Sequence, residues 1–380
     1  MPSVRIIEIL SDLVRFPSVS STENRSISSY VTGLLEQLGL NTEQIFYQDR
    51  DGAEKVNLLA TAGPACEQGG LAYCAHTDVV PVSDWSFEAS GPFDLHQADQ
   101  KLYGRGSCDM KGSLACFLVA LESVDLSQLR SPLSIICTAD EETGYQGASQ
   151  VAQRSKIFRT LCKQQPLTII GEPTLLQVIH AHKGIYSFKA TSHGRAAHSS
   201  TLEGINANLK MIPFLQEMKQ IYEETLSSPA WQHEAFSPTG ISWNIGINDF
   251  TQAVNITPEQ SVCTVSFRPM PDQPADALLK RASEAAEKCG LDFEILCQAP
   301  PVFVDENAAH IQQMLELTGN EKSHTVSYGT DAAMFLELKN LVICGPGDIA
   351  QAHTDDEWID IDQLHRGVDL YRRAIEKFCL

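Results

Sequence analysis

GLAYCAHTD, residues 70–78, places an unbroken apolar run directly before a histidine and an aspartate. Similar short runs recur in the first half of the chain, and each leads into a polar or glycine-containing turn: KVNLLAT at 55–61, PLSIICTA at 132–139 and LTIIGE at 167–172. Helical stretches such as MKGSLACFLVALES, residues 110–123, lie between them. Strands that alternate with helices predict an α/β fold, with a mostly parallel central sheet covered by helices on both faces.

The amino-terminal segments have helical periodicity. Apolar residues recur at helical spacing, with charges between them, at Ile6, Ile9, Leu10, Leu13 and Val14. A second helix is predicted over residues 26–39, where Gly39 would end it. The amino-terminal segment lacks the unbroken apolar run of a signal peptide, and no apolar run reaches the 18 residues of a membrane span. The 11 cysteines form no CxxC pair. We therefore expect a cytoplasmic protein with reduced thiols.

From about residue 182 the pattern changes. The predicted elements follow the order β-α-β-β-α-β, at residues 184–194, 204–224, 241–249, 261–269, 275–290 and 291–298. That order is typical of a small ferredoxin-like α+β domain inserted into a larger one. We therefore expect a discontinuous catalytic domain at 1–181 and 298–380, with the inserted domain at 182–297.

Length and charge narrow the class of protein. A chain of 380 residues with 43% hydrophobic residues is large enough for two cores. Its formal net charge of −20 would repel phosphate backbones and anionic membrane surfaces, so we expect neither nucleic acid nor membrane as a partner. The excess of carboxylates suits divalent cations or a cationic substrate, and it is equally typical of an ordinary acidic protein.

Several candidate functional residues stand at the ends of predicted strands, where sites gather in parallel sheets. His76 ends its run, and Asp78 projects from the same side of an extended chain. A hydrogen-bonded histidine and a turn cap are the ordinary alternatives. Asp109, in GRGSCDMKG at 104–112, could be a helix N-cap, although the flanking glycines would let backbone approach a bound ion. This segment lacks the spacing of a phosphate loop.

Acidic residues follow two other runs. Asp140, Glu141 and Glu142 come directly after PLSIICTA, where consecutive acids repel one another unless a cation offsets their charge. A simple acidic loop is the alternative, just as Glu172 could be a turn residue. With His353, the set contains two histidines and several carboxylates, which suits Zn²⁺ and, if one carboxylate is shared, a two-metal site. One acid could remain free as a general base.

Six motifs together resemble metallopeptidase family M20. They occur in the family's order: HTDVVP (76–81), GRGSCDMKG (104–112), TADEETG (138–144), GEPT (171–174), GRAAHSS (194–200) and GPGDIAQAH (345–353). The resemblance covers essentially the whole chain. The ending GPGDIAQAH-x-x-x-E is most similar to the acetylornithine deacetylase branch.

The resemblance implies two Zn²⁺ ions per chain, with Co²⁺ or Mn²⁺ as substitutes. The implied ligands are His76, Asp109 and Glu172 for one ion and Asp109, Glu142 and His353 for the other. Asp78 would orient His76 through its second ring nitrogen. Glu141 would be the general base, taking a proton from the bridging water and passing it to the leaving amine.

The resemblance also implies a homodimer whose inserted domain serves as dimerisation and lid domain. His198 would reach the partner subunit's site and stabilise an oxyanion there. Asn255 and Arg268 would contact the substrate, with Arg268 pairing its carboxylate. Before Asn255, the sequence lacks the glycine pair that the family often has. Gly329 and Thr330 would lie near the substrate's α-carboxylate, with a turn and helix cap as the alternative.

The implied reaction is removal of an N-acyl group from a small-molecule N-acyl amino acid: N2-acetyl-L-ornithine would give L-ornithine and acetate, in arginine biosynthesis. Within the family, the alternatives are succinyl-diaminopimelate desuccinylase, acetylcitrulline deacetylase, and carboxypeptidase or dipeptidase action. From another class, the chain could be a non-catalytic metal- or amino-acid-binding protein. Glu141 argues against that class, because ligation alone does not require it.

Overall fold

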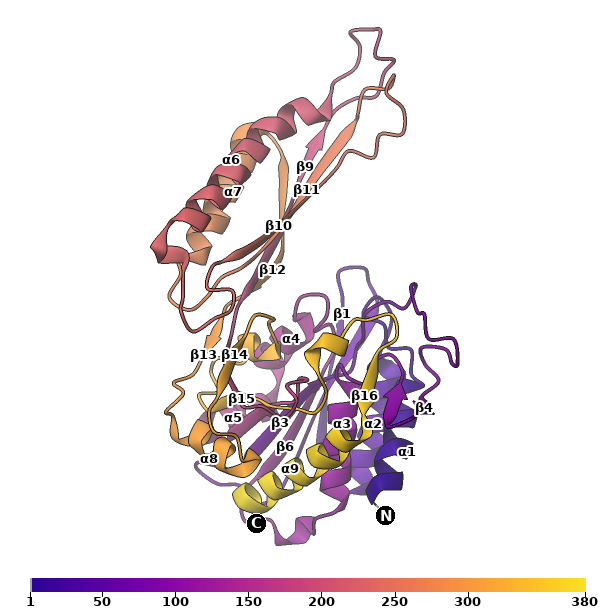
Figure 1. Ribbon diagram of the computed structural model, residues 1–380, viewed down its shortest axis with the longest axis vertical. Coiled ribbons are helices and arrows are strands. Elements are labelled where there is room, and N and C mark those ends of the chain that lie inside the picture. Colours follow the sequence, from indigo (N-terminus) through magenta and orange to yellow (C-terminus); the bar gives the residue numbers. More distant parts are fainter. Residues whose placement is uncertain (1) are drawn as a thin grey trace. The chain divides into compact units, whose positions relative to one another are not determined.

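The computed structural model describes residues 2–380, with side chains from residue 4 onward. The described chain forms two compact units (Figure 1). Unit 1 comprises Met1–Ala181, Phe303–His324 and Thr330–Leu380, and unit 2 comprises His182–Val302 and Thr325–Gly329. The insertion predicted at 182–297 lies inside the first segment of unit 2.

Unit 1 is built on one large sheet whose strands follow the order β1-β2-β6-β3-β7-β15-β8-β13, with β14 paired to β8. The bounds are β1 Asn41–Gln48, β2 Glu54–Ala62, β3 Leu71–His76, β6 Leu133–Thr138, β7 Leu167–Ile170, β8 Ile179–His182, β13 Val302–Phe303, β14 His324–Val326 and β15 Leu341–Ile343. The central strands β6, β3, β7 and β15 are parallel. Every residue of β3, β6 and β7 is buried, so both faces of the sheet are covered. This confirms the predicted α/β class.

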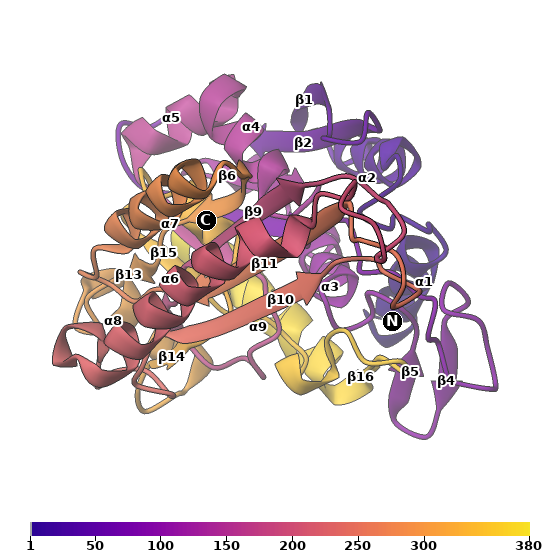
Figure 2. The same cartoon turned by 90° about the horizontal axis from the view of Figure 1, so that it is seen from above.

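Helices cover the sheet of unit 1 (Figures 1 and 2). They are α1 Pro2–Val14, α2 Arg25–Gln37, α3 Lys111–Glu122, α4 Gln146–Arg154, α5 Lys156–Gln164, α8 Ala309–Thr318 and α9 Ile361–Cys379. Helix α3 packs against both α1 and α9. The apolar positions predicted for the first helix are all fully buried in the core. Gly39 follows the end of α2 with a φ of +85°, which explains the stop there.

A small antiparallel sheet in unit 1 was not predicted from the sequence. Its order is β16-β5-β4, with β4 His96–Ala98, β5 Lys101–Tyr103 and β16 Trp358–Asp360. Short 3₁₀ turns complete the unit at Leu126–Gln128 (η1), Asp331–Met334 (η3) and Ile349–Gln351 (η4). The strand β16 lies just after the segment that carries His353, so the small sheet anchors that segment.

Unit 2 has its own antiparallel sheet and core. In chain order its elements are β9 Ile185–His193, α6 Ala207–Ser227, η2 Pro229–Trp231, β10 Ser242–Asn248, β11 Gln260–Arg268, α7 Ala275–Cys289 and β12 Asp292–Ala299. The strand order is β10-β11-β9-β12, and α6 and α7 lie side by side against it (Figure 2). Phe188, Phe214 and Phe267 belong to this core and are at most 1% exposed. The predicted β-α-β-β-α-β order is confirmed.

The helices of residues 2–380 include none with both the length and the apolar character needed to cross a bilayer. The cysteines are free thiols, and most are buried.

Candidate metal centre

The sheet of unit 1 brings the predicted strand-end residues to one edge. In the parallel pairing of β3 with β6, His76 is opposite Thr138, four residues before Glu142. In the pairing of β3 with β7, Cys74 is opposite Ile170, two residues before Glu172. Because parallel strands end on the same side, these side chains converge there.

Asp109 stands between two histidines. Its Oδ1 is 3.0 Å from His76 Nε2, and its Oδ2 is 3.4 Å from His353 Nε2. Asp109 itself is buried, and Met110, which follows it, is the N-cap of α3. The carboxylate therefore offers one oxygen to each side.

Two groups of possible metal ligands share this aspartate. They are His76, Asp109 and Glu172, and Asp109, Glu142 and His353; in each group, the ligand atoms lie within 4.8 Å of one another. His76, Glu141 and Glu142 form a third group by the same measure. His353 Nε2 lies 2.9 Å from Glu142 Oε2, and His353 has a φ of +64°. A non-glycine residue held in this region is often part of a functional site.

Two carboxylate oxygens of the cluster need a partner. Within the described residues, Glu142 Oε1 and Glu172 Oε1 are buried and have no hydrogen-bond partner. A buried, unpaired carboxylate oxygen is costly in free energy. Bound divalent cations would satisfy both oxygens, and the His and carboxylate donor set is one that Zn²⁺ accepts. The residues therefore fit a metal pair.

Burial and mutual repulsion dominate the electrostatics. Burial, and then the neighbouring Asp109, raise the pKa of Glu142 to about 7. Burial likewise raises the pKa of Glu141 and Glu172 well above the usual range. For Asp109, hydrogen bonds from His353 and His76 outweigh burial, and they lower its pKa. Hydrogen bonds to Asp109 and Glu142 raise the pKa of His353 to about 10. The carboxylates of the cluster thus favour positive charge at this point, whether it comes from a proton or from a cation.

Asp78 connects two sides of the cluster. Its backbone oxygen is 3.0 Å from His76 Nδ1, whereas its Oδ1 is 3.6 Å from the same nitrogen. The carboxylate also accepts the backbone N–H groups of Glu141 and Glu142, at 3.2 and 3.3 Å, and the hydroxyl of Ser20 at 2.6 Å. Asp78 therefore holds in place the turn formed by residues 140–142, which we call the acidic turn, and it also contacts His76.

The acidic turn has a further anchor that the sequence did not reveal. Asp140 has a φ of +60°, and its Oδ1 lies 2.8 Å from Nζ of the buried Lys55. The hydroxyl of Tyr47 donates to Asp140 Oδ2 at 2.7 Å. Among the three consecutive acids, Asp140 is thus neutralised by a lysine, which leaves Glu141 and Glu142 for the cluster.

The predicted substrate residues lie partly in unit 2. His198 and Asn255 are exposed and stand on paired loops: His198 bridges Ile256, and the N–H of Ser199 donates to Asn255 O at 2.9 Å. Arg268 is the last residue of β11. Gly329 ends the second segment of unit 2. Thr330 is buried in unit 1 and accepts the N–H of Ala332 at 3.1 Å, as the cap of η3.

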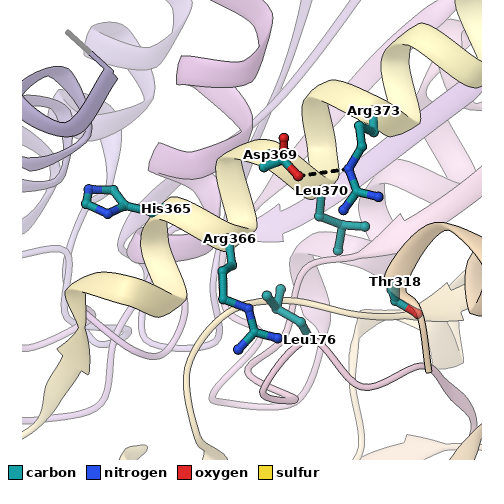
Figure 3. Close-up of a pocket in the computed structure, with 7 residues that line it drawn as sticks. All are labelled: Leu176, Thr318, His365, Arg366, Asp369, Leu370 and Arg373. Atoms are coloured by element: carbon teal, nitrogen blue, oxygen red, sulfur yellow. Dashed lines mark hydrogen bonds and ion pairs between the residues drawn. The ribbon is translucent and has the colours of Figure 1, made fainter. Parts of the chain in front are cut away.

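A separate cavity of about 310 Å³ lies along α9 (Figure 3). Asp369 accepts a hydrogen bond from Arg373 Nε at 2.8 Å, and Arg373 Nη1 donates to Leu317 O at 2.7 Å. The lining residues are Leu176, Thr318, His365, Arg366, Asp369, Leu370 and Arg373. None of them belongs to the strand-end cluster, so the two features are distinct.

Comparison with known proteins places these features in a family. The model of "Peptidase family M20/M25/M40" matches residues 72–377. Acetylornithine deacetylase of Proteus mirabilis (strain HI4320) is 34% identical over 387 residues, covering 98% of this chain and 97% of that protein. The acetylornithine deacetylase of Pasteurella multocida (strain Pm70) is 33% identical over 390 residues, covering 98% of both chains.

Solved structures share the fold. Human carnosine dipeptidase 1 has a TM-score of 0.77 at 17% identity, covering 98% of this chain and 96% of that one. An M20 family metallo-carboxypeptidase of Sulfolobus solfataricus has a TM-score of 0.76 at 16% identity, covering 98% of both. A dinuclear metal binding peptidase of the M20 family from Bacillus subtilis has a TM-score of 0.63 at 15% identity, covering 98% and 97%.

Proposed function

Because the chain belongs to peptidase family M20/M25/M40 and is a hydrolase of that family, we propose that it removes the acetyl group from N2-acetyl-L-ornithine. The products would be L-ornithine and acetate, as a step of arginine biosynthesis. Relatives described as acetylornithine deacetylases, 30–34% identical over 98–100% of this chain, support this substrate. The proposal of two metal ions rests on the position of the Asp109 carboxylate, which has one oxygen toward His76 and the other toward His353.

We propose two Zn²⁺ ions per chain, which Co²⁺ or Mn²⁺ could replace. His76, Asp109 and Glu172 would hold one ion, and Asp109, Glu142 and His353 the other. The support is the shared carboxylate and the two buried oxygens that lack a hydrogen-bond partner in the described chain. When bound, the ions supply Lewis acidity, which polarises the scissile carbonyl and lowers the pKa of the attacking water.

Glu141 would move the proton. Its side chain is half-buried, and burial raises its pKa well above the usual range, so its carboxylate can accept a proton from water and hold it. The same proton would then pass to the leaving amine. Asp78 supports this role because it accepts the backbone N–H of Glu141 and contacts His76. Asp78 would thus hold the proposed base, Glu141, at a fixed position relative to the proposed ligand His76.

Four residues are proposed to contact the substrate. Arg268 would pair the substrate's carboxylate, with Asn255, Gly329 and Thr330 as further contacts. His198 would stabilise the oxyanion in the partner subunit's site. The paired loops that carry His198 and Asn255 support a common role for these two exposed side chains.

An exposed apolar edge of unit 2 supports the proposed homodimer. The edge strand β10, SWNIGIN, carries no charged residue, and its Ile247 is 61% exposed. The following loop exposes Phe250 at 58% and Val254 completely. The opposite edge strand β12 carries Asp292 and Glu294, which protect an edge from pairing. We therefore assign the dimer contact to β10 and its loop.

The test is a substrate panel run with a metal count per chain. N2-acetylornithine, N-acetylcitrulline, N-succinyl-diaminopimelate and dipeptides would be offered to the zinc-loaded protein at equal concentration. We expect about two ions per chain and the highest kcat/KM with N2-acetylornithine. A higher kcat/KM with another member of the panel would contradict the substrate. No hydrolysis of any member with two ions bound would indicate a binding protein instead.

A further inference from the structure

One buried carboxylate outside the cluster collects an unusual set of donors. Glu357 is 1% exposed, and its Oε2 accepts from Arg105 Nη1 at 2.8 Å and from the N–H of Gly106 at 3.0 Å. Its Oε1 accepts the N–H groups of Cys108 and Asp109, at 2.8 and 2.9 Å. The loop that was expected to bring its backbone toward a bound ion therefore turns these N–H groups toward Glu357. Hydrogen bonds to an ionised carboxylate are among the stronger ones in proteins.

The small sheet explains why the two segments meet. Trp358 of β16 pairs with Tyr103 of β5, and the N–H of Gly104 donates to Glu357 O at 3.0 Å. Where strand pairing stops, the Glu357 side chain continues the contact along the loop. Gly106 permits this path, because its φ is +83° and a Cβ there would lie 2.9 Å from Val79 Cγ1.

The segment from His353 to Glu357 reaches Asp109 at two points. His353 Nε2 faces the Asp109 side chain at 3.4 Å, and the Glu357 carboxylate accepts the Asp109 N–H at 2.9 Å. Residues 353–357 thus contact both the backbone of Asp109, through Glu357, and its Oδ2, through His353. Asp109 is also the only residue common to the two proposed ligand groups within the described chain.

We propose that Glu357 is a positioning residue that fixes Asp109 between the two cation sites and thereby sets the affinity for the metal pair. The proposal rests on the two-metal function proposed above. Glu357 acts through the backbone of Asp109 and touches neither substrate nor cation. Residues that orient metal ligands in this way commonly change metal affinity by about 10- to 100-fold when they are replaced.

The test compares Glu357→Gln with a control in which another loop-holding carboxylate is changed. In Glu357→Gln an amide nitrogen would face backbone N–H groups, so the loop would lose an acceptor. Glu43 is the control, because its carboxylate accepts Ser155 Oγ and the N–H groups of Lys156 and Ile157, at 2.6, 2.9 and 3.0 Å. None of these donors belongs to a proposed ligand. Each metal-free protein would be titrated with Co²⁺ and followed by its visible spectrum, and its unfolding would be measured in urea.

We expect Glu357→Gln to bind Co²⁺ about 10- to 100-fold more weakly, with an altered spectrum at saturation. Glu43→Gln should keep the wild-type affinity and spectrum even if it unfolds at lower urea. Glu357→Asp keeps a negative charge beside Arg105, but its side chain is one methylene shorter, so its carboxylate oxygens lie farther from the N–H groups of the loop. This variant tests the same positioning role if Glu357→Gln does not fold. Wild-type Co²⁺ affinity in a folded Glu357 variant would overturn the proposal. Failure of the proposed function would instead appear in the wild-type chain, as an absence of binding.

Discussion

The cluster separates carboxylates that have protein partners from carboxylates that lack them. Asp140 is paired with Lys55 and Tyr47, and Asp78 accepts two backbone N–H groups. In the described part of the chain, Glu142 and Glu172 each keep a buried oxygen without a hydrogen bond. The sequence identified these acids because they follow apolar runs. It could not show which of them is neutralised, since Lys55 and Tyr47 are far from Asp140 along the chain.

Replacing Glu141 with glutamine should remove the proton acceptor and leave the ligands in place. We expect kcat to fall by roughly 10²- to 10⁴-fold, which is the usual contribution of a general base. Metal analysis should still find two ions per chain. Glu142→Gln is the matched comparison, because loss of a proposed ligand should lower the ion count as well as the rate. Near-normal turnover of Glu141→Gln with both ions bound would refute the assignment of the base.

The turn that carries the acids also depends on a close approach by α4. A Cβ added at Gly147 would lie 2.0 Å from Ala139 O and 2.7 Å from Asn57 Oδ1. Asn57 in turn accepts the N–H of Ala139 at 3.0 Å and donates to Gly147 O at 3.0 Å. A glycine at this point therefore lets the helix sit directly against the residue that precedes the acidic turn.

Gly147→Ala should destabilise the protein by about 1–3 kcal/mol, because the methyl group would displace backbone rather than a flexible side chain. It should also lower activity by displacing Glu141. Gly33→Ala is the control: Gly33 lies inside α2 with nothing within 4 Å of an added Cβ, so alanine there should stabilise by about 0.5–1 kcal/mol. Urea unfolding of both variants checks the sign. Equal effects at the two glycines would contradict the close approach.

The larger elements were predictable, and the small ones were not. Apolar runs of four to six residues such as β3, β6 and β7 are buried throughout, and α1 has a regular stripe, so both are visible in the sequence. Strands β4, β5 and β16 each contain three residues, too few for a periodic pattern. Their pairing joins segments that precede and follow unit 2 in the sequence. The contact between Glu357 and the Asp109 loop depends on the same pairing, so the sequence did not predict it either.

Removing the metals should lower the stability of the protein. The cluster gathers carboxylates whose repulsion the cations would offset. An ion present at 100 times its Kd stabilises the native state by about 2.7 kcal/mol. For a unit of the size of unit 1, that free energy corresponds to an increase of roughly 5–10 °C in Tm. Calorimetry before and after chelation measures this, with Zn²⁺ added back as the control. An unchanged Tm in protein shown to have lost its ions would contradict a cation pair at this cluster.

A charge on β10 should prevent dimer formation if this edge is the contact. We expect Ile247→Lys to sediment as a monomer and to lose turnover, since His198 would no longer reach a partner subunit. Ile295→Lys places the same charge on β12, the opposite edge of the same sheet, where Ile295 is 44% exposed. It should remain dimeric and active. A dimeric Ile247→Lys protein would place the contact elsewhere.

The hydrogen bond between Glu357 and Cys108 joins positions 249 residues apart. A ribosome adding about 5–20 residues per second needs roughly 12–50 seconds to travel between them. Once Glu172 has been synthesised, the nascent chain carries His76, Asp109, Glu142 and Glu172, but neither His353 nor the Glu357 carboxylate that holds the Asp109 loop. The emerging polypeptide would therefore have an incomplete ligand set until His353 and Glu357 have been translated, and its capacity to capture a metal pair would arise late in biogenesis.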